Sequence, residues 1–89
     1  MKEITLPTIH LNGTGAANLK REYRAVLTAL HDATEALAQA TCHPRDFYPQ
    51  GDGAWQRARA ERKEAFRSLQ DVEKYVEQWL LHIQDSGRV

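Results

Sequence analysis

Apolar side chains recur at helical spacing along two long segments of the chain. In residues 14–41 they are separated alternately by four and three residues, the repeat of a helix that packs against a second helix. The row consists of Leu19, Tyr23, Val26, Leu30, Ala33, Leu37 and Ala40, with Leu27 and Thr34 on one flank. This pattern predicts a helix over residues 14–41, with Thr14 as its N-cap.

The same alternation returns in residues 54–85. Its row consists of Trp55, Ala58, Arg62, Ala65, Leu69, Val72, Val76, Trp79 and Ile83, with Phe66, Tyr75 and Leu80 beside it. We predict a second helix over 54–85, with Asp52 or Gly53 as its N-cap and Gly87 as its C-terminal signal. Residues 42–53 contain two prolines and two glycines, so they are expected to form a loop.

Residues 1–13 do not follow the helical repeat. Ile4, Leu6, Ile9 and Leu11 are apolar, but Pro7 interrupts them and Asn12-Gly13 is a turn signal. This segment is expected to be an extended arm.

Two long helices joined by one loop predict an all-α, antiparallel two-helix hairpin that forms a single domain. With the loop centred near residue 47, two acid-base groups face each other only in the antiparallel arrangement. Lys20, Arg21 and Arg24 then face Glu73, Lys74 and Glu77, and Asp32 and Glu35 face Arg59, Arg62 and Lys63. Surface ion pairs contribute only a few tenths of a kcal/mol each, so they favour an orientation and do not drive folding.

A two-helix hairpin of 89 residues has little core, and its only cysteine, Cys42, cannot form an internal disulfide. Four apolar residues lie outside the row that the two helices share, and another part of the protein must shield them from water. They are Phe66, Tyr75, Leu80 and Leu81. Either the arm folds back or a second copy packs alongside. Thirteen extended residues reach about 43 Å and a 27-residue helix is about 40 Å long, so the arm is long enough to meet the loop of its own chain or of a partner. We expect a helical-bundle oligomer, most simply a dimer.

Composition narrows the function classes. Twelve basic and twelve acidic side chains cancel, and Glu61 and Glu64 interrupt the one basic stripe, which argues against nucleic-acid binding. No apolar run is long enough for a membrane span or a signal peptide. A single unpaired thiol fits a reducing compartment, so we expect a cytoplasmic protein.

The loop holds the densest polar chemistry. Arg45 is suited to clamp a phosphate or carboxylate, and Tyr48 and Trp55 offer rings for stacking. The amino end of the second helix, with Arg57 one turn inside it, offers free amides to an anion. The alternative is structural: Phe47 and Tyr48 plug the end of the hairpin, while Arg45 pairs with a neighbour such as Asp46.

The arm offers a second polar group. Thr8, His10, Asn12 and Thr14 alternate with apolar residues, so they share one face of an extended segment. If that face meets the loop, His10 and Asn12 complete a polar pocket with Arg45 and Tyr48. Otherwise the arm only caps the hairpin and turns the chain into the first helix.

Arg62 lies in the apolar row, where charged residues need partners. We expect it either to extend to Asp32 or Glu35 across the hairpin or to bind an anion between the helices. The four histidines match no metal-ligand spacing, and no nucleophile-base or phosphate-loop arrangement is present. We therefore predict no metal, no cofactor and no catalysis.

Two segments carry a resemblance. The arm Leu6-Pro7-Thr8-Ile9-His10-Leu11-Asn12-Gly13-Thr14 and the loop Arg45-Asp46-Phe47-Tyr48-Pro49-Gln50-Gly51 resemble those of short helical hairpins encoded by bacteriophages and prophages. In shape the chain is similar to the phage anti-CBASS and anti-Thoeris proteins that sequester cyclic-nucleotide immune signals. The resemblance implies a phage protein that captures a small anionic ligand in the host cytoplasm. The alternative is an interaction module that docks on a host or virion protein through its exposed apolar face.

Overall fold

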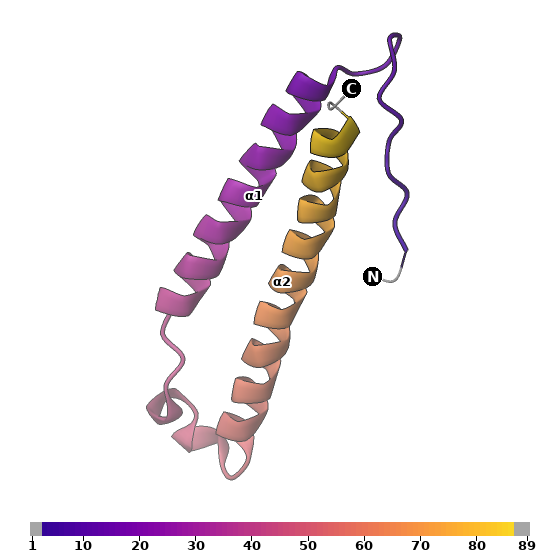
Figure 1. Ribbon diagram of the computed structural model, residues 1–89. Coiled ribbons are helices and arrows are strands. Elements are labelled where there is room, and N and C mark those ends of the chain that lie inside the picture. Colours follow the sequence, from indigo (N-terminus) through magenta and orange to yellow (C-terminus); the bar gives the residue numbers. More distant parts are fainter. Residues whose placement is uncertain (1–2, 87–89) are drawn as a thin grey trace.

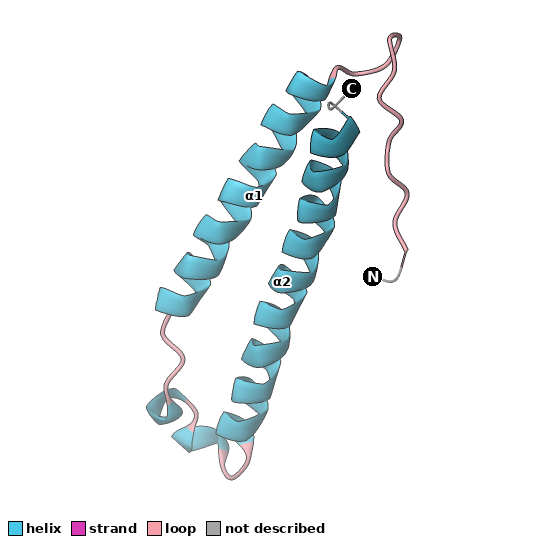
Figure 2. Ribbon diagram, in the orientation of Figure 1, coloured by secondary structure: helices cyan, strands magenta, loops and turns pink. Residues whose placement is uncertain are grey.

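The computed structural model describes residues 3–86, and they form a helical hairpin. Helix α1 spans Ala16–Gln39 and helix α2 spans Ala54–Ser86, with two short 3-10 turns between them, η1 (Pro44–Asp46) and η2 (Tyr48–Gln50). The two long helices run antiparallel, side by side (Figure 1). Figure 2 shows helices and loops only over the described residues. The all-α hairpin is thus confirmed.

Both helix starts are set by glycines. The Gly15 carbonyl accepts the Leu19 N–H at 3.1 Å and no side chain caps the helix, so the prediction of Thr14 as N-cap is wrong. At α2, the Gly53 carbonyl accepts the Arg57 N–H at 3.0 Å. Gly53 therefore caps the second helix, one of the two expected candidates. Gly87 lies outside the described residues.

The core of the hairpin is thin. Of the described residues, only Ala54, Val76 and Ile83 are fully buried. The ring of Tyr23 stacks on that of Trp79 with centroids 4.4 Å apart and planes 10° apart, and this pair joins α1 to α2 near the open end of the hairpin. A hairpin with so little buried surface has few apolar contacts to stabilise it.

The face that α1 turns toward α2 differs from the predicted row. Leu27 and Thr34 are half-buried, whereas Val26 and Ala33 are exposed, so the predicted row is wrong at these positions. A straight helix drifts by about 20° per heptad relative to a strict seven-residue repeat, and this drift moves the contact face to the flanking residues. Thr34 tolerates its position because its hydroxyl donates to the Leu30 carbonyl at 2.8 Å.

The register between the helices also differs from the prediction. Glu73, expected opposite Lys20 and its basic neighbours, faces His31 with 3.9 Å between its Oε1 and the histidine Nε2. No predicted acid-base pair between the helices forms among the described residues. The reason is that the start of α2 extends past the end of α1 (Figure 1), and the loop residues pack on this overhang.

Arg62 caps the carboxyl end of α1. Its Nη2 donates to the carbonyls of Leu37 and, at 2.9 Å, of Ala40. The last carbonyls of a helix carry partial negative charge, and they often lack donors within the helix. Arg62 supplies a donor to the Ala40 carbonyl and a second donor to the Leu37 carbonyl, which also accepts the Ala40 N–H at 3.2 Å. The predicted partners Asp32 and Glu35 are wrong, because the shifted register brings Arg62 level with the helix end.

The arm packs on its own hairpin. It turns at the Gly13 N–H, which donates to the His10 carbonyl at 3.1 Å, and runs back beside the carboxyl-terminal part of α2 (Figure 1). There the His82 Nε2 lies 2.6 Å from the Pro7 carbonyl. The described part of the arm, residues 3–13, lies well short of the loop (Figure 1). No helix in residues 3–86 has the length and apolar character of a membrane span.

Candidate ligand site at the loop end

The loop is a rigid platform built from turns. Pro44 and Pro49 sit at the starts of the two 3-10 turns, where a missing N–H costs nothing. The His43 Nδ1 accepts the Arg45 N–H at 3.1 Å, which fixes the first turn. Gly51, with φ 89° and ψ −173°, reverses the chain in a conformation that is essentially restricted to glycine.

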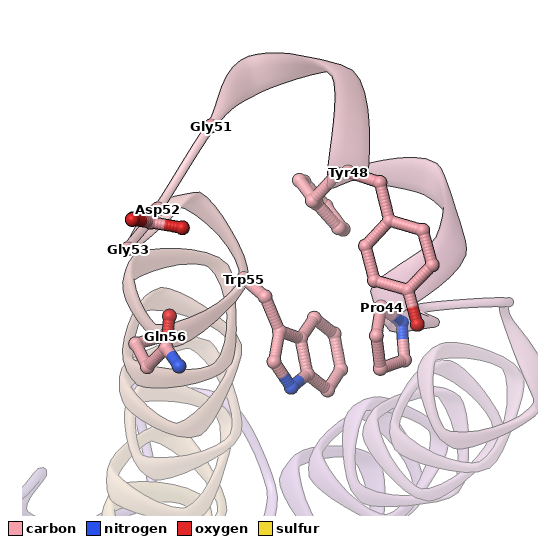
Figure 3. Close-up of a pocket in the computed structure, with 8 residues that line it drawn as sticks. Pro44, Tyr48, Gly51, Asp52, Gly53, Trp55 and Gln56 are labelled. Atoms are coloured by element: carbon pink, nitrogen blue, oxygen red, sulfur yellow. The ribbon is translucent and has the colours of Figure 1, made fainter.

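An aromatic hollow of about 380 Å³ opens between the loop and the start of α2. Figure 3 shows the ring of Tyr48 and the indole of Trp55 directed toward Pro44, with the polar groups of Asp52 and Gln56 on the other side of Trp55. The hollow is lined by Pro44, Phe47, Tyr48, Gly51, Asp52, Gly53, Trp55 and Gln56. Rings and a few polar groups of this kind suit a flat, polar-edged molecule.

A second hollow, of about 400 Å³, also has Trp55 in its lining. It is basic, with Arg59, Arg62 and Lys63 in its lining together with Cys42, Trp55 and Phe66. Arg62 is already bonded to the end of α1 and lies 5.4 Å from the Phe66 ring centroid. Arg59 and Lys63 are exposed and form no ion pair among the described residues, so they are the cations available to an anion.

Trp55 joins the two hollows, because it lines both. Its ring lies 5.9 Å from the Phe47 ring and 5.9 Å from the Arg59 guanidinium carbon. Phe47 is half-buried whereas Tyr48 is 71% exposed. Phe47 therefore acts as the plug expected in the structural alternative, and Tyr48 does not.

The structure brings two of the predicted site residues together. Tyr48 and Trp55 line the aromatic hollow. Arg45 is exposed and lines neither hollow, and no ion pair with Asp46 forms among the described residues. Arg57 is exposed and its guanidinium lies over Gly53, close to the amino end of α2.

His10 and Asn12 lie at the other end of the molecule. Both are exposed, the His10 ring lies over Gly13, and this turn sits at the open end of the hairpin, opposite the loop (Figure 1). The molecule measures 61 Å along its long axis. The predicted pocket formed by the arm and loop of one chain is therefore wrong, because the arm runs along α2 only part of the way.

The sequence-based reasoning missed Arg59 and Lys63 as site residues. The sequence contains a signal for them: Trp55, Arg59 and Lys63 are spaced four apart, and side chains at this spacing share a helix face.

No group of three metal-ligating side chains is close enough to hold a metal ion within residues 3–86. No protein-family model, curated protein or solved structure matches the chain, so function is inferred from its own residues and geometry.

Proposed function

We propose that this protein binds and sequesters a small anionic, ring-bearing ligand of the nucleotide class at the loop end of the hairpin. The observation that carries the proposal is the position of Trp55 between an aromatic hollow and a basic one. A nucleotide has the same two parts, a flat base and a charged phosphate. The proposed role is binding without catalysis.

Each part of the site has a distinct task in this proposal. The base stacks on Trp55 and Tyr48, and the carboxylate of Asp52 accepts a hydrogen bond from the amino or hydroxyl edge of the ligand. Stacking of one base on an aromatic side chain contributes about 1–3 kcal/mol. Arg59 and Lys63 bind the phosphate, and hydrogen bonds to a charged group contribute about 1.5–3 kcal/mol each.

The resemblance to short phage-encoded hairpins supports a biological setting for this activity. A protein that holds a cyclic nucleotide without converting it lowers the free concentration of that signal, which would blunt a host defence that depends on it. This role places the protein in the host cytoplasm. An alternative role, docking on a host or virion protein, uses exposed apolar residues such as Leu81, which is 61% exposed.

Isothermal titration calorimetry tests the proposal, with cyclic di- and trinucleotides and cyclic forms of ADP-ribose as probes. Wild-type protein is expected to bind at least one of them. Trp55→Leu and Lys63→Met should each weaken that binding about tenfold or more, the loss expected for 1.4 kcal/mol or more. Met keeps much of the bulk of the Lys63 side chain without its charge, and Leu keeps an apolar side chain at position 55 without its ring.

Lys74→Met is the matched control, because Lys74 is an exposed cation on the same helix that lines neither hollow. It should bind like wild type. The proposal is wrong if none of the probes binds the wild-type protein, or if all three variants bind equally well. If no probe binds, the docking role can be tested in its place. A purified host or virion protein that binds the wild type but does not bind Leu81→Glu would favour that role.

A further inference from the structure

Two polar side chains in the aromatic hollow have hydrogen-bonding capacity that the protein itself does not use. Asp52 and Gln56 both line the hollow, and Figure 3 shows them on the same side of Trp55. Both are exposed, and neither side chain forms a hydrogen bond or an ion pair within residues 3–86. They are therefore free to bind the edge of a ring that stacks on Trp55.

The two side chains offer a defined set of donors and acceptors. A carboxylate only accepts hydrogen bonds, through two oxygens, whereas an amide carries both a donor and an acceptor. Among the described residues, Asp52 is the only charged one in the lining of the aromatic hollow. The hollow therefore presents two adjacent acceptors, from Asp52, and an amide donor, from Gln56.

Guanine is the base whose edge complements this set. Its Watson–Crick edge, by which proteins read unpaired bases, carries two adjacent donors, the N1–H and the 2-amino group, beside the O6 acceptor. Adenine has an unprotonated N1 in place of the N1–H, so its lone pair would face the carboxylate and oppose binding. Cytosine and uracil have no two adjacent donors on this edge.

We infer that the site selects guanine nucleotides, with Asp52 accepting from the N1–H and the 2-amino group and Gln56 donating to O6. The inference rests on the proposed function, because it assigns the base that the proposed nucleotide site holds. Asp52 lines the aromatic hollow and not the basic one, so its negative charge faces the base and the phosphate stays with Arg59 and Lys63.

The size of the preference follows from the paired contact. A matched pair of hydrogen bonds discriminates between bases by about fivefold to about a hundredfold. Asp52 is exposed, and water competes for its oxygens, so the lower part of this range applies. We expect a preference for guanine over adenine of about tenfold.

Isothermal titration calorimetry with cyclic di-GMP and cyclic di-AMP tests the inference, because these two ligands differ only in their bases. Wild-type protein should bind cyclic di-GMP about tenfold more tightly. Cyclic di-IMP, which lacks only the 2-amino groups, should bind with intermediate affinity, because each base then has one donor in place of two for the carboxylate.

Asp52→Asn should abolish the preference, because an amide accepts from the adenine amino group and donates to adenine N1. The ratio of the two affinities is the readout, since a merely structural change would weaken both ligands alike. Asp71→Asn is the matched control and should keep the preference, because Asp71 is an exposed carboxylate on α2 that lines neither hollow. Circular dichroism checks that both variants fold.

The outcomes separate this inference from the proposed function. Equal affinities, tighter binding of cyclic di-AMP, or an unchanged preference in Asp52→Asn would overturn guanine selection and leave nucleotide binding intact. If neither dinucleotide binds but another nucleotide probe does, guanine selection is again wrong and the proposed function stands. If no nucleotide probe binds the wild-type protein, both are wrong.

Discussion

Removal of the Arg62 cap should destabilise the hairpin more than any other change of a surface cation. Arg62 donates to two carbonyls at the end of α1 and is the one described side chain that hydrogen-bonds across the two helices to backbone. In Arg62→Met the apolar stem still packs, but the Ala40 carbonyl loses its donor and the Leu37 carbonyl keeps only the Ala40 N–H at 3.2 Å. The substitution thus isolates the hydrogen bonds and the charge.

The magnitude follows from the two contacts. Hydrogen bonds to a charged group contribute about 1.5–3 kcal/mol each when well shielded, and Arg62 is only half-buried, so the lower end applies. A cation near a helix carboxyl terminus adds about 0.3–1 kcal/mol. Because the Leu37 carbonyl keeps the Ala40 N–H as a donor, only the bond to Ala40 counts in full. We therefore expect a loss of about 2–2.5 kcal/mol in the free energy of unfolding, which for a domain of this size lowers Tm by about 8–20 °C.

Urea unfolding followed by circular dichroism at fixed protein concentration measures this loss, and the concentration must be fixed because association shifts apparent stability. Arg62→Lys should fall between wild type and Arg62→Met, because an ammonium keeps the charge but loses the planar fork. Arg59→Met is the matched control and should lower the free energy of unfolding by less than about 1 kcal/mol, because Arg59 loses only its cation–π contact with Trp55 at 5.9 Å. Equal losses in Arg59→Met and Arg62→Met would refute the capping role.

Three further predictions concern the loop, the arm and alkaline pH. Gly51→Ala should lower the free energy of unfolding by about 1–3 kcal/mol, because Gly51 has φ 89°. Gly15→Ala, at φ −65° with open space around it, should cost less in the same urea assay, because only the preference for glycine over alanine at an N-cap opposes it. His82→Ala should remove the contact with the Pro7 carbonyl and increase the backbone mobility of Ile4 and Leu6 in nitrogen-15 relaxation, while unchanged relaxation would mean that other contacts hold the arm. Burial, with smaller contributions from Tyr75 and Glu22, raises the pKa of the Tyr23 hydroxyl above its ordinary value of 10.0. The stabilisation that the neutral hydroxyl contributes is therefore fully present below pH 10 and is lost as the pH rises through the pKa of the folded state. In a pH series of thermal melts, Tm of Tyr23→Phe should fall less at alkaline pH than Tm of the wild type.

The hairpin itself was predictable because its signals are local. Apolar spacing marks each helix, and the prolines and glycines of 42–53 mark the loop. The register between the helices could not be predicted from the position of the loop centre. That prediction assumed two helices that end level with each other, whereas the start of α2 extends past the end of α1 (Figure 1). Once the register moved, the partner of Arg62 changed from a carboxylate to backbone carbonyls, which no side-chain pattern reveals.

The candidate site was predictable in part for the same reason. Trp55 and Tyr48 are close in sequence and remain close in space, whereas His10 and Asn12 depended on the path of the arm. That path is set by where Pro7 and its neighbours pack on α2, a tertiary contact far apart in sequence. Arg59 and Lys63 follow Trp55 at helical spacing, a local signal that the sequence contains, but the sequence analysis did not select them as site residues.

The position of the ligand tests the central claim most directly, and the two tryptophans provide an internal comparison. In a nuclear magnetic resonance titration of the nitrogen-15-labelled protein with a cyclic dinucleotide that binds, the Trp55 indole N–H and the amides of residues 51–63 should shift. The indole N–H of Trp79, which is buried near the open end, should stay in place. Shifts centred on His10 to Gly13 or on Trp79, with Trp55 unchanged, would contradict a site at the loop end.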